Sequence, residues 1–166
     1  LLTAAIALPI LIASIILPWW VPDTIWIFVL IAVLALAAGM FEFFSLTKKL
    51  ELKADAGVAY LGAAGLIVLF VLDAPRQDPS LLLIVLVCFL VVVFITQTFR
   101  FQKDFSKMLA GMGVTVLGVL YVAFLGGFLI ATRVGFDSIL STKLLLFFFV
   151  VIFGSDAGQY FVGKAL

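Results

Sequence analysis

The sequence has no histidine and a single cysteine among its 166 residues. The absence of histidine excludes histidine-based catalysis and histidine metal ligands from this stretch of chain. The single cysteine, Cys88, excludes a disulfide within the chain and provides no metal-binding spacing. Cys88 lies inside a long apolar run, so we expect it to be a small hydrophobic residue of the core or of the lipid-facing surface.

Charge is also scarce. Only 11% of the residues are charged and 66% are hydrophobic, whereas a soluble domain has about 25% charged and about 45–50% apolar residues. The chain is therefore not a soluble domain, and its net charge of +1 says nothing about partners. There is no P-loop, no dinucleotide-binding glycine motif and no Ser/His/Asp set. The basic loops are too small to indicate nucleic-acid binding.

Long apolar stretches are abundant instead. A membrane-spanning helix needs about 20 mostly apolar residues. Such stretches occupy residues 2–21, 25–46, 56–72, 80–96, 108–131 and 143–163. We predict an all-α polytopic membrane protein, a bundle of about six transmembrane helices that forms one domain over residues 1–166. A signal peptide is the rival interpretation of the first stretch, but that stretch is long for one and lacks a clear cleavage site.

Proline and glycine add detail to this prediction. Pro9 and Pro18 predict kinks in the first stretch. The fifth stretch is unusually rich in glycine, with Gly111, Gly113, Gly118, Gly126 and Gly127. Glycine at this density in a membrane helix indicates close packing against neighbouring helices.

The placement of the basic residues predicts an orientation. Seven of the ten basic residues fall on one set of alternate connections, namely Lys48, Lys49, Lys53, Arg100, Lys103, Lys107 and Lys164. The other set holds Arg76, Arg133 and Lys143. Because basic loops stay in the cytoplasm, both visible ends of the chain are expected to be cytoplasmic.

The last stretch carries an acid inside an apolar span. Asp156 follows a long run of Leu, Phe and Val, and an acid at the centre of a membrane helix costs about 2.5–3.5 kcal/mol on insertion scales. We therefore expect Asp156 to be satisfied by a partner, a water-filled cavity or a metal. Two interpretations stay open: a ligand for Mg²⁺, which prefers oxygen donors, and a structural hydrogen bond to a neighbouring helix.

Other polar residues share the helix face of Asp156. At about 100° per residue, Gln159, Tyr160 and Gly163 fall with it in an arc of roughly 100°. Gly154 and Gly158 form a G-x-x-x-G pair on the opposite side, which is typical of a helix-packing face.

Each of these residues has a functional and a structural interpretation. The Tyr160 hydroxyl is a candidate donor to Asp156 or to a lipid phosphate, or else an interfacial packing group. Gln159 is read as a further polar group of the same cavity. Lys164 is a candidate phosphate-binding residue or an ordinary anchor at the membrane surface. Near the end of the second stretch, Glu42 is a further acid, and it is expected to be exposed at the interface.

The order of residues 155–164 is informative. It reads Ser-Asp-Ala-Gly-Gln-Tyr-Phe-Val-Gly-Lys and resembles the Ala-Asp-Thr-Gly-Ala-Tyr-Phe-x-Gly-Arg segment of the phosphatidate cytidylyltransferases, or CDP-diacylglycerol synthases. The matches are Asp156, Gly158, Tyr160, Phe161, Gly163 and, conservatively, Lys164. The departures are Ser155, Ala157 and Gln159. Weaker similarity covers residues 3–5, 41–46 and 117–122.

The resemblance implies a reaction in which CTP and phosphatidic acid give CDP-diacylglycerol and diphosphate, as a step of phospholipid biosynthesis. It implies Mg²⁺ as cofactor, with Asp156 as metal ligand and catalytic residue, and Tyr160, Gln159, Lys164 and Gly163 at the substrates. The expected partners are CTP, phosphatidic acid and the lipid bilayer, with a homodimer left open and no nucleic acid. The expected location is the bacterial inner membrane.

One part of the family pattern is absent. The Lys-Asp…His-Gly-Gly…Asp signature does not occur in these residues. Because the sequence begins with Leu1 and ends with its motif, it looks like the amino-terminal portion of a longer enzyme, and we expect it to be inactive alone. The alternatives are a transporter or channel with Asp156 as its coupling acid, and a related CTP-dependent lipid or isoprenoid kinase.

Overall fold

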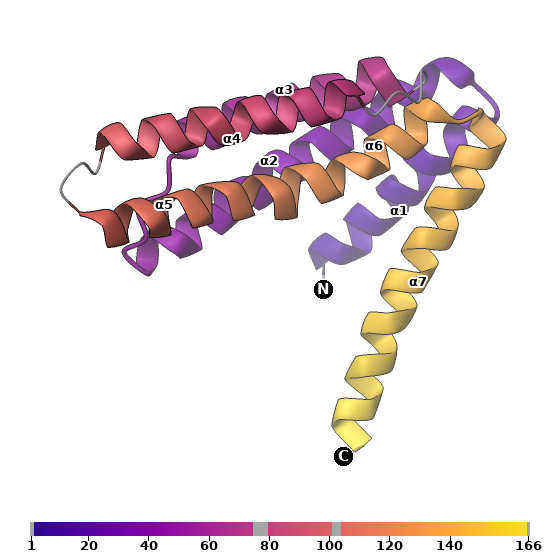
Figure 1. Ribbon diagram of the computed structural model, residues 1–166. Helices are drawn as coiled ribbons and strands as arrows, with labels where there is room; N and C mark the ends of the chain where they lie inside the picture. Colours follow the sequence, from indigo (N-terminus) through magenta and orange to yellow (C-terminus); the bar gives the residue numbers. More distant parts are fainter. Residues whose placement is uncertain (1, 75–79, 101–103, 166) are drawn as a thin grey trace.

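The computed structural model describes residues 2–74, 80–100 and 104–165, and the side chains of residues 8–74, 80–100 and 104–164. Within these ranges the chain is almost entirely helical and contains no strand (Figure 1). The elements are α1 (Leu2–Ile16), η1 (Leu17–Trp19), η2 (Pro22–Thr24), α2 (Ile25–Lys49), α3 (Ala56–Asp73), α4 (Ser80–Arg100), α5 (Phe105–Gly118), η4 (Val119–Phe124), α6 (Leu125–Gly135) and α7 (Ser138–Ala165). Arg76 and Lys103 of the predicted charge pattern lie outside the described residues, as do the side chains of segment 3–5.

The all-α membrane fold is confirmed, but the number of long helices is smaller than predicted. Five helices in the described part of the chain are long and apolar enough to cross a membrane. The expected first span is the exception, because α1 has only 15 residues. At 1.5 Å per residue it is about 22 Å long, against a hydrocarbon core of about 30 Å. The helix ends early because Pro18 has no N–H to donate, and the chain turns into the short helix η1.

Two connections are also shorter than predicted. The expected loop 132–142 is mostly helical, since α6 continues to Gly135 and α7 begins at Ser138. The Asp137 carboxylate explains the early start of α7, because its Oδ2 accepts hydrogen bonds from the N–H groups of Ile139 (3.1 Å) and Leu140 (3.0 Å). Likewise α5 begins at Phe105, where Asp104 Oδ1 accepts a bond from the Lys107 N–H (3.2 Å).

The long fifth span is one continuous helix with a π-helical segment, η4, at its centre. The expected close packing at its glycines is confirmed at most positions. A Cβ at Gly126 would collide with Leu36, one at Gly127 would collide with the ring of Phe70, and those at Gly118 and Gly111 would also clash with neighbours. Gly113 is different, because a Cβ at this position would meet nothing within 4 Å. Because glycine has no side chain, these positions let α2 and α3 approach this helix closely.

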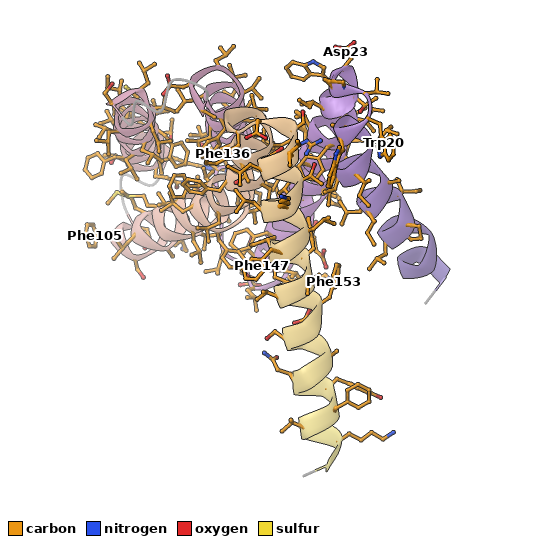
Figure 2. All side chains as sticks on the ribbon, turned by 90° about the vertical axis from the view of Figure 1, so that its right-hand side faces the viewer. Trp20, Asp23, Phe105, Phe136, Phe147 and Phe153 are labelled. Atoms are coloured by element: carbon orange, nitrogen blue, oxygen red, sulfur yellow. The ribbon has the colours of Figure 1, made fainter. Side chains whose placement is uncertain are left out.

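The helices form a tight group, apart from one that leaves it. Buried side chains of α2, α3, α4 and η4 make the main core, which includes Met40, Leu66, Val93 and Val119. A second, smaller cluster of Ile15, Phe28 and Leu145 joins α1, α2 and the start of α7. From there α7 departs from the other helices, and its carboxy-terminal end lies well below them in Figure 1. Figure 2 shows the same helix standing clear beyond Phe153.

Candidate functional site

The first turns of α7 are fixed by a buried arginine. Arg133, near the end of α6, has no exposed surface. Its Nη1 donates to Ser141 Oγ (3.1 Å) and to Thr142 Oγ1 (3.0 Å). Thr142 Oγ1 in turn donates to the Ile15 carbonyl (3.1 Å). One polar cluster therefore ties the end of α6, the start of α7 and the end of α1 together.

The predicted polar face lies on the free part of α7. Asp156, Gln159, Tyr160 and Gly163 are all exposed, and so is every described side chain from Val150 to Lys164. Gln159 Nε2 donates to Ser155 Oγ across one turn (3.4 Å). Asp156 makes no hydrogen bond or ion pair with any residue that the structure describes. The bond suggested between Tyr160 and Asp156 is likewise not formed among the described side chains.

The opposite face of α7 is equally open. A Cβ placed on Gly154, Gly158 or Gly163 would meet nothing within 4 Å. The G-x-x-x-G pair therefore packs against no helix in the described part of the chain, although the sequence predicts a packing face there. Glu42 is exposed, as expected. It lies on α2, a different helix from the one that carries the α7 residues. The structure thus places the predicted site residues together on one helix but brings no second element to them within the described ranges.

The carboxylates that the structure describes do not form a complete metal site by themselves. Within residues 2–74, 80–100 and 104–165, no group of three or more Asp, Glu, Cys or His residues gathers around a point. Asp156 is a single exposed carboxylate, so a complete cage of protein ligands is not present in these ranges. Mg²⁺ nevertheless needs only one or two carboxylates when substrate phosphates and water complete its shell. Asp156 fits that role as one ligand.

A second polar region lies at the opposite end of the bundle from the α6–α7 turn. It is a pocket of about 720 Å³ under the α2–α3 connection. Its lining residues are Phe44, Lys48, Glu51, Leu52, Lys53, Ala54, Ala56, Arg100 and Lys107. The sequence predicts basic loops at this end. It gives no sign that α2, the loop after it, α4 and α5 each bring a cation to one cavity.

Arg133 is the other feature that sequence analysis missed. It reads as an ordinary loop charge, because its partners Ser141 and Thr142 belong to the same predicted polar loop. A signal does exist in retrospect: an arginine, a serine and a threonine lie within ten residues between two apolar spans. Only the folded arrangement shows that they meet with α1 in a buried cluster.

Together, the fold and composition define a polytopic α-helical membrane protein whose last helix carries exposed polar residues beyond its packed part. A family model described as the cytidylyltransferase family matches residues 1–166. The chain therefore belongs to the cytidylyltransferase family, and this membership supports an enzyme of the nucleotidyltransferase type. The family implies CTP and a lipid substrate in a membrane setting. Comparison with curated proteins finds no match, and neither does comparison with solved structures.

Proposed function

We propose that the protein is a phosphatidate cytidylyltransferase of phospholipid biosynthesis. In this reaction a phosphate oxygen of phosphatidic acid attacks the α-phosphorus of CTP. A new P–O–P bond forms, and the bond from the α-phosphorus to the oxygen that bridges to the β-phosphorus breaks. The products are CDP-diacylglycerol and diphosphate. The family assignment supports the cytidylyl transfer, and the residue match at 155–164 supports phosphatidic acid as the acceptor.

The exposed carboxylate of Asp156 is the observation that carries the proposal. It sits in α7, an apolar helix of 28 residues, where an acid is costly. A structural role predicts a hydrogen-bond partner on a neighbouring helix, and none of the described residues supplies one. The carboxylate is therefore available to a ligand from outside these residues, as a substrate-binding role requires.

Asp156 would hold Mg²⁺ together with phosphate oxygens of CTP. When bound, this ion neutralises phosphate charge and favours in-line displacement. The other residues act on the substrates themselves. Tyr160 lies one turn further along the same face and donates its hydroxyl to the lipid phosphate, and Lys164 attracts phosphate at the membrane surface. Gln159 adds an amide donor, and Gly163 leaves open space for the substrate.

The test measures label transfer by the full-length protein in phosphatidic acid vesicles. With CTP labelled in its α-phosphate, cytidylyl transfer moves the label into lipid, whereas a lipid kinase moves label only from the γ-phosphate. We expect Asp156→Asn to lose at least about 100-fold in turnover, since electrostatic groups at the reacting phosphates contribute on this scale. Asp23→Asn is the matched control, because Asp23 lies on the short helix η2 outside the proposed site.

Full activity of Asp156→Asn would show that the carboxylate is structural, and lipid labelling from the γ-phosphate would show a kinase instead of a transferase.

Location in the bacterial inner membrane, cytoplasmic ends and a homodimer belong to the same proposal. Family membership and the apolar helices support a multi-pass membrane setting, while orientation depends on the basic loops.

A further inference from the structure

The basic pocket at the end of α2 has the shape and chemistry of a binding site. Among the described residues that line it, four are cations, Lys48, Lys53, Arg100 and Lys107, and one is an acid, Glu51. Its volume of about 720 Å³ is within the range of about 300–1,000 Å³ typical of small-molecule sites. It lies apart from α7, whose polar end is remote from this end of the bundle in Figure 1.

Two of the four cations already have carboxylate partners. Arg100 Nη1 lies 4.0 Å from Asp55 Oδ2, and Lys107 Nζ lies 2.7 Å from Asp104 Oδ2. The hydrogen bond from Lys107 holds the pKa of Asp104 below its usual value, so this pair stays ionised at neutral pH. No carboxylate within 4.0 Å pairs with Lys48 or Lys53 among the described residues. These two lysines therefore supply the positive charge that attracts an anion.

The loop that carries Lys53 is held in place before any ligand arrives. The N–H groups of Leu50 and Leu52 donate to the Thr47 carbonyl (3.1 Å each). Glu51 adopts a left-handed backbone conformation, with φ of 60°. At the end of the loop, the Asp55 N–H donates to Thr115 Oγ1 on α5 (2.9 Å). A loop fixed in this way loses little conformational entropy when it binds a ligand.

The surroundings of the pocket indicate which anion it takes. Phe44 and Leu52 give part of the lining an apolar character. Two large apolar side chains at the same end of the bundle are strongly exposed, Leu50 (71%) and Phe105 (72%). A free nucleotide needs no such surface, whereas a phospholipid presents phosphate beside its acyl chains. Basic pockets at the ends of membrane helices suit anionic lipid headgroups.

We propose that this pocket binds the phosphate of an anionic phospholipid, with Lys48 and Lys53 as its main contacts and the exposed apolar side chains against the acyl chains. This site is separate from the α7 face, and its occupation requires no cytidylyl transfer. The site would keep anionic lipid at the enzyme independently of turnover. The lipid-binding proposal therefore does not depend on the proposed function.

The experiment counts lipids bound to the purified full-length protein by native mass spectrometry, with phosphatidic acid added to detergent micelles and no CTP. The key variants are Lys53→Gln and Lys48→Gln. The matched control is Lys49→Gln. Lys49 is an exposed lysine next to Lys48 at the end of α2, but it does not line the pocket. We expect each pocket variant to weaken lipid retention about fivefold or more, as the loss of one lysine near a lipid phosphate does.

The control is expected to change retention less than about twofold, because Lys49 does not line the pocket and its charge is screened from a phosphate held there. Lys53→Arg should retain the lipid, which shows that charge rather than a folding defect explains the loss in Lys53→Gln. Equal weakening by all three glutamine variants would overturn the proposal in favour of diffuse surface attraction. Displacement of the lipid by equimolar inorganic phosphate or CTP would overturn the choice of a lipid ligand.

Discussion

The buried cluster around Arg133 allows a quantitative prediction about how α7 is attached. Thr142→Val removes one of the two hydrogen bonds that the guanidinium makes to described residues, and also the bond to the Ile15 carbonyl. A buried charged donor left without its partner costs about 1–3 kcal/mol, and an ordinary hydrogen bond contributes about 0.5–1.5 kcal/mol. In an Arg133→Met background only the second loss remains. The cost of Thr142→Val should therefore fall by about 1–3 kcal/mol when Arg133 is absent.

This expected coupling free energy is larger than the average of about 0.6 kcal/mol measured for side-chain hydrogen bonds in membrane proteins. The reason is that Arg133 is charged and its Nε and Nη2 already lack partners among the described residues. The measurement is a double-mutant cycle on the free energy of unfolding in bicelles. Thr132→Val is the control, because the Thr132 hydroxyl bonds to the Phe128 carbonyl within its own helix and to no other residue that the structure describes. The same cost for Thr142→Val in both backgrounds would refute the reasoning.

Two further predictions concern packing and orientation. Gly111→Ala should lower the free energy of unfolding by about 1–3 kcal/mol, because the new Cβ would lie 2.8 Å from the Lys53 carbonyl oxygen. Gly113→Ala should raise the free energy of unfolding by up to about 1 kcal/mol, because its Cβ meets open space. Equal effects of the two variants in thermal unfolding would contradict this prediction. In a Cys88→Ala background, a membrane-impermeant maleimide should label Lys49→Cys from the cytoplasmic side and Asp23→Cys from the other, and the reverse pattern would exclude the predicted orientation.

Much of the fold could be predicted because membrane helices are a local property. Length and apolarity alone identify the five long helices, and the glycine-rich fifth span correctly predicted close approach of neighbours at Gly126 and Gly127. The misplaced boundaries have local causes too, since Asp104 and Asp137 cap helices that were expected to begin later. The prediction of a packing face at Gly154 was not met by any described element, because spacing shows that close approach is allowed but not what approaches.

The sequence by itself determined the membrane class, the five long helices and the family, because apolar length and a run of matching residues are read along the chain. It also placed Asp156 and Tyr160 on one face, since helical periodicity fixes that arrangement. Only the tertiary structure decided that Arg133 is buried, and that Lys53 on a loop and Lys107 on another helix line one pocket. Such groupings depend on how separate helices pack, and no spacing within a single helix contains that information.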